Sequence, residues 1–161
     1  MDNLYLYRVE ADYLRYLHRI DRRVSVKNNR AFVGIVVMIN GIQYLIPLTS
    51  KTTAERINEG KRKRSSMVTL FIRDSSDTEI ASLLYNNMIP VRDTLCLKLN
   101  IDMKINTYEL NELRFIRKNK SKIINKAQHV YNNRINGGNL FLNHVCCDFK
   151  RLEQALMDYT K

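Results

Sequence analysis

Two cations and two hydroxyls meet at the open end of a predicted β-hairpin, where together they could hold a phosphate group. Arg30 comes before the first strand of this hairpin, and Thr49-Ser50-Lys51 follow the second. Guanidinium and ammonium groups neutralise phosphate charge, and hydroxyls donate hydrogen bonds to phosphate oxygens. The alternative is a solvated strand end with a turn-forming Thr-Ser pair, because polar residues of these types commonly end strands.

The hairpin itself is indicated by two apolar runs on either side of Asn40-Gly41. Asn-Gly is typical of two-residue hairpin loops, because both loop residues must adopt positive φ. If these two residues form the loop, the register follows by counting outward from them. The expected pairs are Ile39 with Ile42, Val37 with Tyr44, Ile35 with Ile46, Ala31 with Ser50, and Arg30 with Lys51.

The composition points to a polyanionic partner. The chain has 161 residues, which suits a single domain over residues 1–161, and 27 Lys and Arg against 16 Asp and Glu give a net charge of +11. So large an excess favours nucleic acid, with an anionic membrane surface as the competing explanation. No segment approaches the roughly 18 continuous apolar residues of a spanning helix, and the first residues lack the features of a signal peptide. We therefore expect a cytoplasmic protein with no membrane partner.

Neither a metal site nor a cofactor is expected. The three cysteines fit a reducing compartment, and adjacent Cys146-Cys147 lack the spacing of zinc ligands. His18, His129 and His144 are scattered, and no glycine-rich phosphate loop occurs.

The predicted elements give an α+β fold, with an antiparallel sheet of about six strands flanked by about four helices. Strands are expected near residues 4–9, 31–39, 42–48, 67–73, 79–85 and 88–91, and a last strand or packed extended piece at 94–99. A first helix should run from Glu10-Ala-Asp12 to about Ile20, and Thr52 with Glu55 fits a capping box for a short helix ending at Gly60. Helical periodicity then predicts one long helix from Asn106 to about Arg134 and a final helix from Leu142 to Tyr159.

Two groups of basic residues are candidates for RNA contacts, and a solvated loop and helix face is the alternative for both. They are Lys61, Arg62, Lys63 and Arg64 in one run, and Arg117, Lys118, Lys120 and Lys122 in the long helix.

Several segments, taken in order, resemble the ToxN/AbiQ-type family of endoribonuclease toxins from type III toxin–antitoxin systems. They are Asp12-Tyr-Leu-Arg-Tyr-Leu17, Arg30-Ala-Phe-Val-Gly-Ile-Val, Tyr44-Leu-Ile-Pro-Leu-Thr-Ser-Lys51, Met88-Ile-Pro-Val91 and Phe115-Ile-Arg117. The resemblance extends over nearly the whole chain.

This resemblance implies a strongly twisted antiparallel sheet similar to the MazF/Kid-like toxin fold, and metal-independent cleavage of cellular or phage RNA. It implies a small RNA antitoxin, made from tandem repeats, that the toxin cuts and then holds in a closed protein–RNA assembly. The family's hydroxyl pair matches Thr49 and Ser50, and its first-helix tyrosine matches Tyr13. Arg30 stands where the family commonly has lysine, which leaves an electrostatic role but no proton transfer, because guanidinium does not deprotonate in proteins.

RNA can be cut without a metal ion when its own 2′-OH attacks the adjacent phosphate, giving a 2′,3′-cyclic phosphate and a 5′-OH. Arg30 and Lys51 could hold the charged phosphorane, and Ser50 and Thr49 could bind its oxygens or orient the 2′-OH. Tyr13 could do the same or stack on a base. The competing hypotheses are a non-catalytic basic nucleic-acid-binding module or regulator, and a scaffold that pairs through its final helix.

Overall fold

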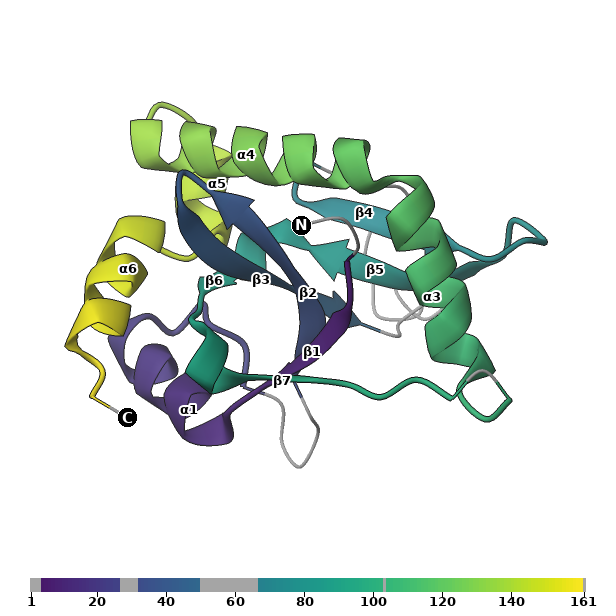
Figure 1. Ribbon diagram of the computed structural model, residues 1–161. Coiled ribbons are helices and arrows are strands. Elements are labelled where there is room, and N and C mark those ends of the chain that lie inside the picture. Colours follow the sequence, from purple (N-terminus) through teal and green to yellow (C-terminus); the bar gives the residue numbers. More distant parts are fainter. Residues whose placement is uncertain (1–3, 27–31, 50–66, 103, 161) are drawn as a thin grey trace.

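One antiparallel sheet is the centre of the fold in the computed structural model, which describes residues 4–26, 32–49, 67–102 and 104–160 (Figure 1). Six of its seven strands follow the order β4-β5-β3-β2-β1-β7, and the seventh, the short β6, pairs with β3 outside this order. The strands are β1 (Leu6–Val9), β2 (Val33–Ile39), β3 (Ile42–Thr49), β4 (Thr69–Arg73), β5 (Glu79–Leu84), β6 (Ile89–Pro90) and β7 (Cys96–Lys98). The predicted α+β class and antiparallel sheet are therefore confirmed.

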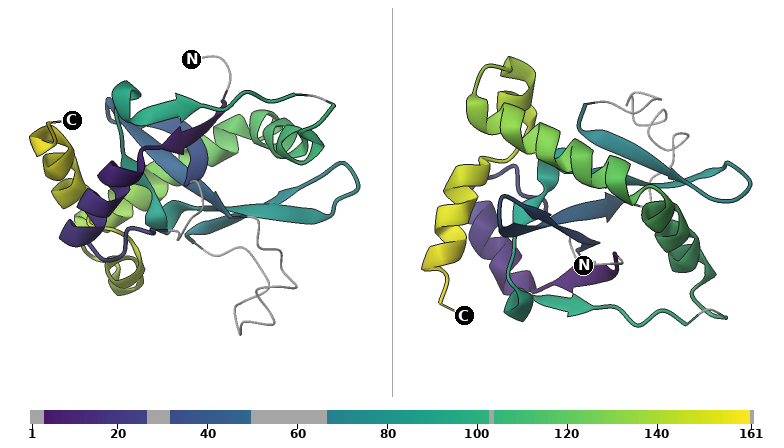
Figure 2. Two further views of the ribbon diagram at one scale, coloured as in Figure 1. Left: turned by 90° about the horizontal axis from the view of Figure 1, so that it is seen from below. Right: turned by 45° about the horizontal axis from the view of Figure 1, so that its top comes forward.

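Helices cover the sheet and close one end of the molecule. Among the described residues they are α1 (Ala11–Ile20), α3 (Thr107–Lys118), α4 (Lys120–Asn136), α5 (Leu140–Val145) and α6 (Phe149–Asp158), with short turns η1 (Tyr85–Asn87) and η2 (Asp93–Leu95). α4 packs against β2 and α3 packs against β4. α1 and α6 lie together at the end that holds the C-terminus (Figure 2), where the Tyr16 hydroxyl donates to the Ala155 carbonyl at 2.8 Å.

The central hairpin forms with the register that its loop predicts. Asn40 and Gly41 have φ of 51° and 81°, as a two-residue loop with positive φ at both positions requires. Ile39 pairs with Ile42, and the pairing continues without a shift to Gly34, which lies opposite Pro47. The expected pairs beyond it, which involve Arg30, Ala31, Ser50 and Lys51, lie outside the described residues, as does the predicted helix at 52–60.

Gly34 lets β2 and β3 approach each other closely. A Cβ at this position would lie 2.2 Å from the backbone oxygen of Ile46. Because that atom belongs to the neighbouring strand's backbone, no side-chain adjustment can relieve the clash. The glycine of the Phe-Val-Gly-Ile segment is thus required by packing.

The expected single helix over 106–134 is wrong, because the chain turns at Asn119 between α3 and α4 (Figure 1). The Asn119 backbone and side-chain nitrogens both donate to the Phe115 carbonyl, at 3.0 and 2.8 Å, and so end α3. The apolar side of each helix is buried on its own side of the turn, and Ile116 in α3 and Ile123 in α4 are fully enclosed. The break lets each half cover a different part of the sheet.

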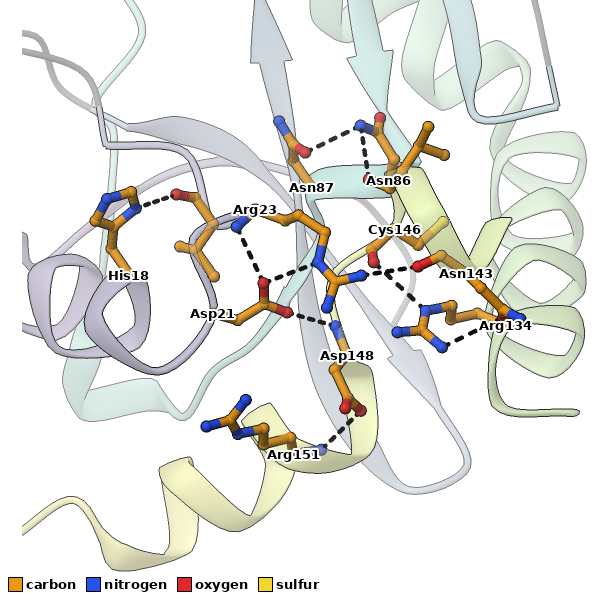
Figure 3. A network of polar contacts seen from close by, with 12 residues as sticks. His18, Asp21, Arg23, Asn86, Asn87, Arg134, Asn143, Cys146, Asp148 and Arg151 are labelled. Atoms are coloured by element: carbon orange, nitrogen blue, oxygen red, sulfur yellow. Dashed lines mark hydrogen bonds and ion pairs between the residues drawn. The ribbon is translucent and has the colours of Figure 1, made fainter. Parts of the chain in front are cut away.

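The final helix is also split, here by a polar network that ties α5 and α6 to the end of α1 (Figure 3). The buried Asp21 carboxylate accepts from the Asp148 backbone nitrogen at 2.7 Å and from the Arg23 Nε at 2.9 Å. Asp148 is the N-cap of α6, and the Cys147 nitrogen donates to the Asn86 carbonyl at 3.0 Å. These bonds hold residues 146–148 out of helical conformation.

The pKa of Asp21 reflects this network. Burial opposes ionisation, but hydrogen bonds from the Arg23 side chain and from the Asp148 and Arg23 backbone outweigh it and lower the pKa below its usual value. Asp21 is therefore an ionised structural residue at neutral pH.

Candidate functional site

Thr49 is the one member of the predicted phosphate cluster that the described residues include. It is the last residue of β3, pairs with Ser82 of β5, and is only 9% exposed, while Ser82 is fully buried. β3 pairs with β2 along most of its length and with β5 at its end, so Thr49 lies where the two halves of the sheet meet. Arg30, Ser50 and Lys51 lie outside the described residues, and their grouping with Thr49 remains a prediction.

Tyr13 has the position of a core residue. Its side chain is fully buried, its hydroxyl donates to the Pro90 carbonyl at 2.6 Å, and burial raises the pKa of the phenol. Pro90 lies opposite Tyr44, and Tyr44 and Thr49 are five residues apart, which is roughly 17 Å of extended strand. The Tyr13 hydroxyl therefore lies beside the half of β3 nearer the hairpin loop, and the described structure does not bring it to the end where Thr49 lies.

The predicted RNA-binding residues of the helical region surround the turn between α3 and α4. Lys118 and Lys122 are exposed and Lys120 is half-buried. Arg117 also supports the fold, because its Nε donates to the Leu4 carbonyl at 3.1 Å and its guanidinium lies 5.1 Å from the Tyr5 ring. The four residues from Lys61 to Arg64 lie outside the described part of the chain.

A cavity of about 500 Å³, which we call the α3 cavity, lies beside the end of the hairpin. Val33, which begins β2, and Leu48, which precedes Thr49, both line it. Its other lining residues are Leu6, Leu99 and Ile101, and the polar Arg8, Asn100, Asn106, Glu109 and Glu112. In the sequence, Thr49 follows the lining residue Leu48, and Arg30 precedes the lining residue Val33 by three positions.

Glu112 is the feature that the sequence analysis missed. Its side chain is 6% exposed, and burial, followed by the nearby Glu109, raises the pKa of its carboxyl to about 8. Glu112 lies one turn before Ile116 and so falls on the buried stripe of α3. A charged residue on an apolar helix face was the available signal, because acidic side chains are rarely buried without a partner.

Within the described residues, no helix has the length and apolar character needed to cross a membrane.

Known proteins match this chain over nearly its whole length. Residues 5–157 match the family model described as toxin ToxN, type III toxin–antitoxin system. The chain is 30% identical to the endoribonuclease ToxN of Bacillus thuringiensis subsp. kurstaki, covering 98% of this chain and 85% of that protein. It is 31% identical to the endoribonuclease AbiQ of Lactococcus lactis subsp. lactis, covering 98% and 90%.

Two solved structures share the fold. One comes from a study of selective toxin inhibition by a non-coding RNA pseudoknot in type III systems, with a TM-score of 0.85, 28% identity and 98% coverage of both chains. The other is that of AbiQ, a lactococcal anti-phage endoribonuclease, with a TM-score of 0.84, 26% identity and the same coverage.

Proposed function

The chain belongs to the ToxN/AbiQ family of endoribonuclease toxins of type III toxin–antitoxin systems, and on this premise we propose how it cuts RNA. The substrate's 2′-OH attacks the adjacent phosphate without a metal ion, giving a 2′,3′-cyclic phosphate and a 5′-OH. The observation that supports this proposal is the hairpin, which forms its expected register from Ile39–Ile42 to Gly34–Pro47. Continuing that register in the sequence, we expect Arg30 and Ser50-Lys51 at the same end of the hairpin as Thr49.

In this mechanism the protein positions the reacting groups and stabilises charge. Arg30 and Lys51 balance the extra negative charge of the phosphorane, and Ser50 and Thr49 hydrogen-bond its oxygens or orient the 2′-OH. The buried Thr49 is held by its strand pairing with Ser82 and so needs little reorganisation. Tyr13 is proposed to act indirectly: its hydroxyl donates to the Pro90 carbonyl of β6, which pairs with β3, the strand that carries Thr49.

The remaining features of the proposal concern partners and fold. A related toxin is inhibited by a non-coding RNA pseudoknot, and we assign this chain an inhibitor of the same kind, derived from tandem repeats and processed by the toxin into a closed protein–RNA assembly. AbiQ is an anti-phage endoribonuclease, and the same abortive-infection role, with cellular or phage RNA as substrate, is proposed here. We further propose a single MazF/Kid-like domain over the whole chain.

The alternative of a non-catalytic nucleic-acid-binding module is set aside, because relatives that match the chain from end to end are endoribonucleases.

The test is cleavage of a defined RNA by the purified protein and by its Ser50→Ala variant, with analysis of the product ends. Wild type should yield a 2′,3′-cyclic phosphate and remain active in EDTA. Ser50→Ala should lower the rate by a factor on the order of 100 or more, as when one oxyanion donor is lost. Loss of wild-type activity in EDTA, restored by magnesium, would contradict the proposed chemistry.

A further inference from the structure

The α3 cavity is an open pocket to which the cleavage mechanism assigns no role. Its volume of about 500 Å³ falls within the range of roughly 300–1,000 Å³ found for small-molecule sites, and its lining is divided between apolar and polar residues. Leu6, Val33 and Leu48 provide apolar walls from three adjacent strands, and α3 contributes Glu109 and Glu112. Apolar walls with convergent hydrogen-bonding groups suit a flat, polar-edged ring.

Glu112 provides the second and independent sign of a ligand. Its side chain is more than nine-tenths buried, it lines the cavity, and among the described residues no donor is bonded to its carboxyl. The Glu112 oxygens are not among the fully enclosed atoms, so they are reachable from the cavity that the residue lines. The carboxyl is therefore available to hydrogen-bond a molecule that enters the cavity.

We propose that the α3 cavity receives one unpaired nucleobase of the RNA substrate and that Glu112 hydrogen-bonds its Watson–Crick edge. This inference rests on the proposed function, since the base would belong to the RNA that is cut at the neighbouring end of β3. The base would lie next to the end of β3, because Leu48 in the cavity wall precedes Thr49. A paired base could not enter, because its Watson–Crick edge is occupied, so the pocket selects single-stranded RNA.

The protonation state of Glu112 decides which edge it can read. Burial, and then Glu109, raises the pKa of the carboxyl to about 8, so the neutral acid predominates near pH 7 and offers one donor beside one acceptor. Each base presents such a pair on its Watson–Crick edge, but the order of donor and acceptor in adenine and cytosine is the reverse of that in guanine and uracil. A carboxyl held in one orientation in the cavity therefore distinguishes these two groups of bases. The ionised carboxylate offers acceptors only, which suit the two adjacent N–H groups of guanine.

Among the described lining residues, Arg8 on β1 and Glu109 on α3 are the charged groups other than Glu112. Arg8 is exposed and lies where it can contact the phosphate of the bound nucleotide. Glu109 is the charged neighbour that, after burial, raises the pKa of Glu112.

The experiment compares wild type with Glu112→Gln, Glu112→Ala and a control, Asp158→Asn, an exposed carboxylate on α6. Each protein cuts a randomised RNA pool near pH 7, and sequencing of the new ends gives the base preference at each position. Glu112→Ala should lose selectivity at one position by a factor on the order of 10–100, the worth of one two-bond base contact. Glu112→Gln should keep that selectivity, because an amide also carries a donor beside an acceptor.

A binding arm separates this inference from the proposed function. RNA oligonucleotides with a 2′-deoxy group at the cut site, with either a base or an abasic residue at the selected position, are titrated against each protein by fluorescence anisotropy. Wild type should bind the abasic RNA at least tenfold more weakly, and Glu112→Ala should bind the two alike. If the pool is cut with unchanged selectivity by Glu112→Ala, or if wild type binds both oligonucleotides equally, the nucleobase pocket is refuted while the cleavage activity stands. Failure of wild type to cut any RNA would refute the proposed function instead.

Discussion

Replacing Glu112 by glutamine should stabilise the protein at neutral and alkaline pH. The carboxyl has a pKa of about 8 in the folded protein, raised by burial and by Glu109, against a reference value of 4.5. An acid with a raised folded pKa contributes stability that is fully present below the unfolded pKa. This stability is lost as the pH rises toward the folded pKa, because the unfolded chain releases the proton first. Glutamine has no proton to lose and keeps the neutral shape.

The size of the effect follows from the two pKa values. Wild type should lose on the order of 3 kcal/mol of folding free energy at about pH 7 relative to Glu112→Gln, and less than about 1 kcal/mol at about pH 5. Urea denaturation of both proteins at these two pH values, with linear extrapolation, measures the difference. Asp158→Asn is the control and should show no such pH-dependent gain. A Glu112→Gln gain that is equal at both pH values would refute the reasoning, because it would come from packing and not from ionisation.

Three further predictions concern the fold and the basic surface. Gly34→Ala should destabilise the protein by about 1–3 kcal/mol or more, since its Cβ would meet the Ile46 backbone oxygen, and an unchanged urea midpoint would contradict this. Asp21→Asn should cost on the order of 2 kcal/mol at neutral pH, and the cost should shrink as the pH falls through the depressed pKa of Asp21. Urea midpoints that differ by the same amount down to acidic pH would argue against an ionised Asp21. Lys118→Glu and Lys122→Glu should each lower the slope of log affinity for single-stranded RNA against log salt by about 0.7 or more per phosphate contact, whereas an unchanged slope would mean that the side chain is only solvated.

The sequence predicts those parts of the fold that local chemistry determines. The hairpin register is correct because Asn40-Gly41 constrains the backbone at the loop itself, and α1 follows its own apolar stripe. The break between α3 and α4 was missed because the apolar stripe continues across it, although the bonds that end α3, from Asn119 to Phe115, are local. The break between α5 and α6 was missed because a distant residue stabilises it. The bond from the Asp148 nitrogen to Asp21 spans 127 positions, and periodicity within 142–159 contains no trace of it.

In the candidate site, too, the features set by neighbouring residues could be predicted and those set by distant residues could not. Thr49 could be placed at a strand end because its position depends only on the hairpin. The α3 cavity could not be predicted, because its walls combine the β2–β3 hairpin with β1 and α3, which are distant from the hairpin or from each other in the chain. Tyr13 was assigned by resemblance to the family, and only the packing shows that its hydroxyl donates to the Pro90 carbonyl, beside the half of β3 nearer the hairpin loop.

The substrate's own 2′-OH is the proposed nucleophile, and the most direct test of this role uses two RNA oligonucleotides. They are identical except for a 2′-deoxy group at the nucleotide 5′ of the cut. We predict that the all-ribose RNA is cut to a 2′,3′-cyclic phosphate and that the 2′-deoxy RNA binds with similar affinity but is not cut. Cleavage of the 2′-deoxy RNA at a comparable rate would contradict the account.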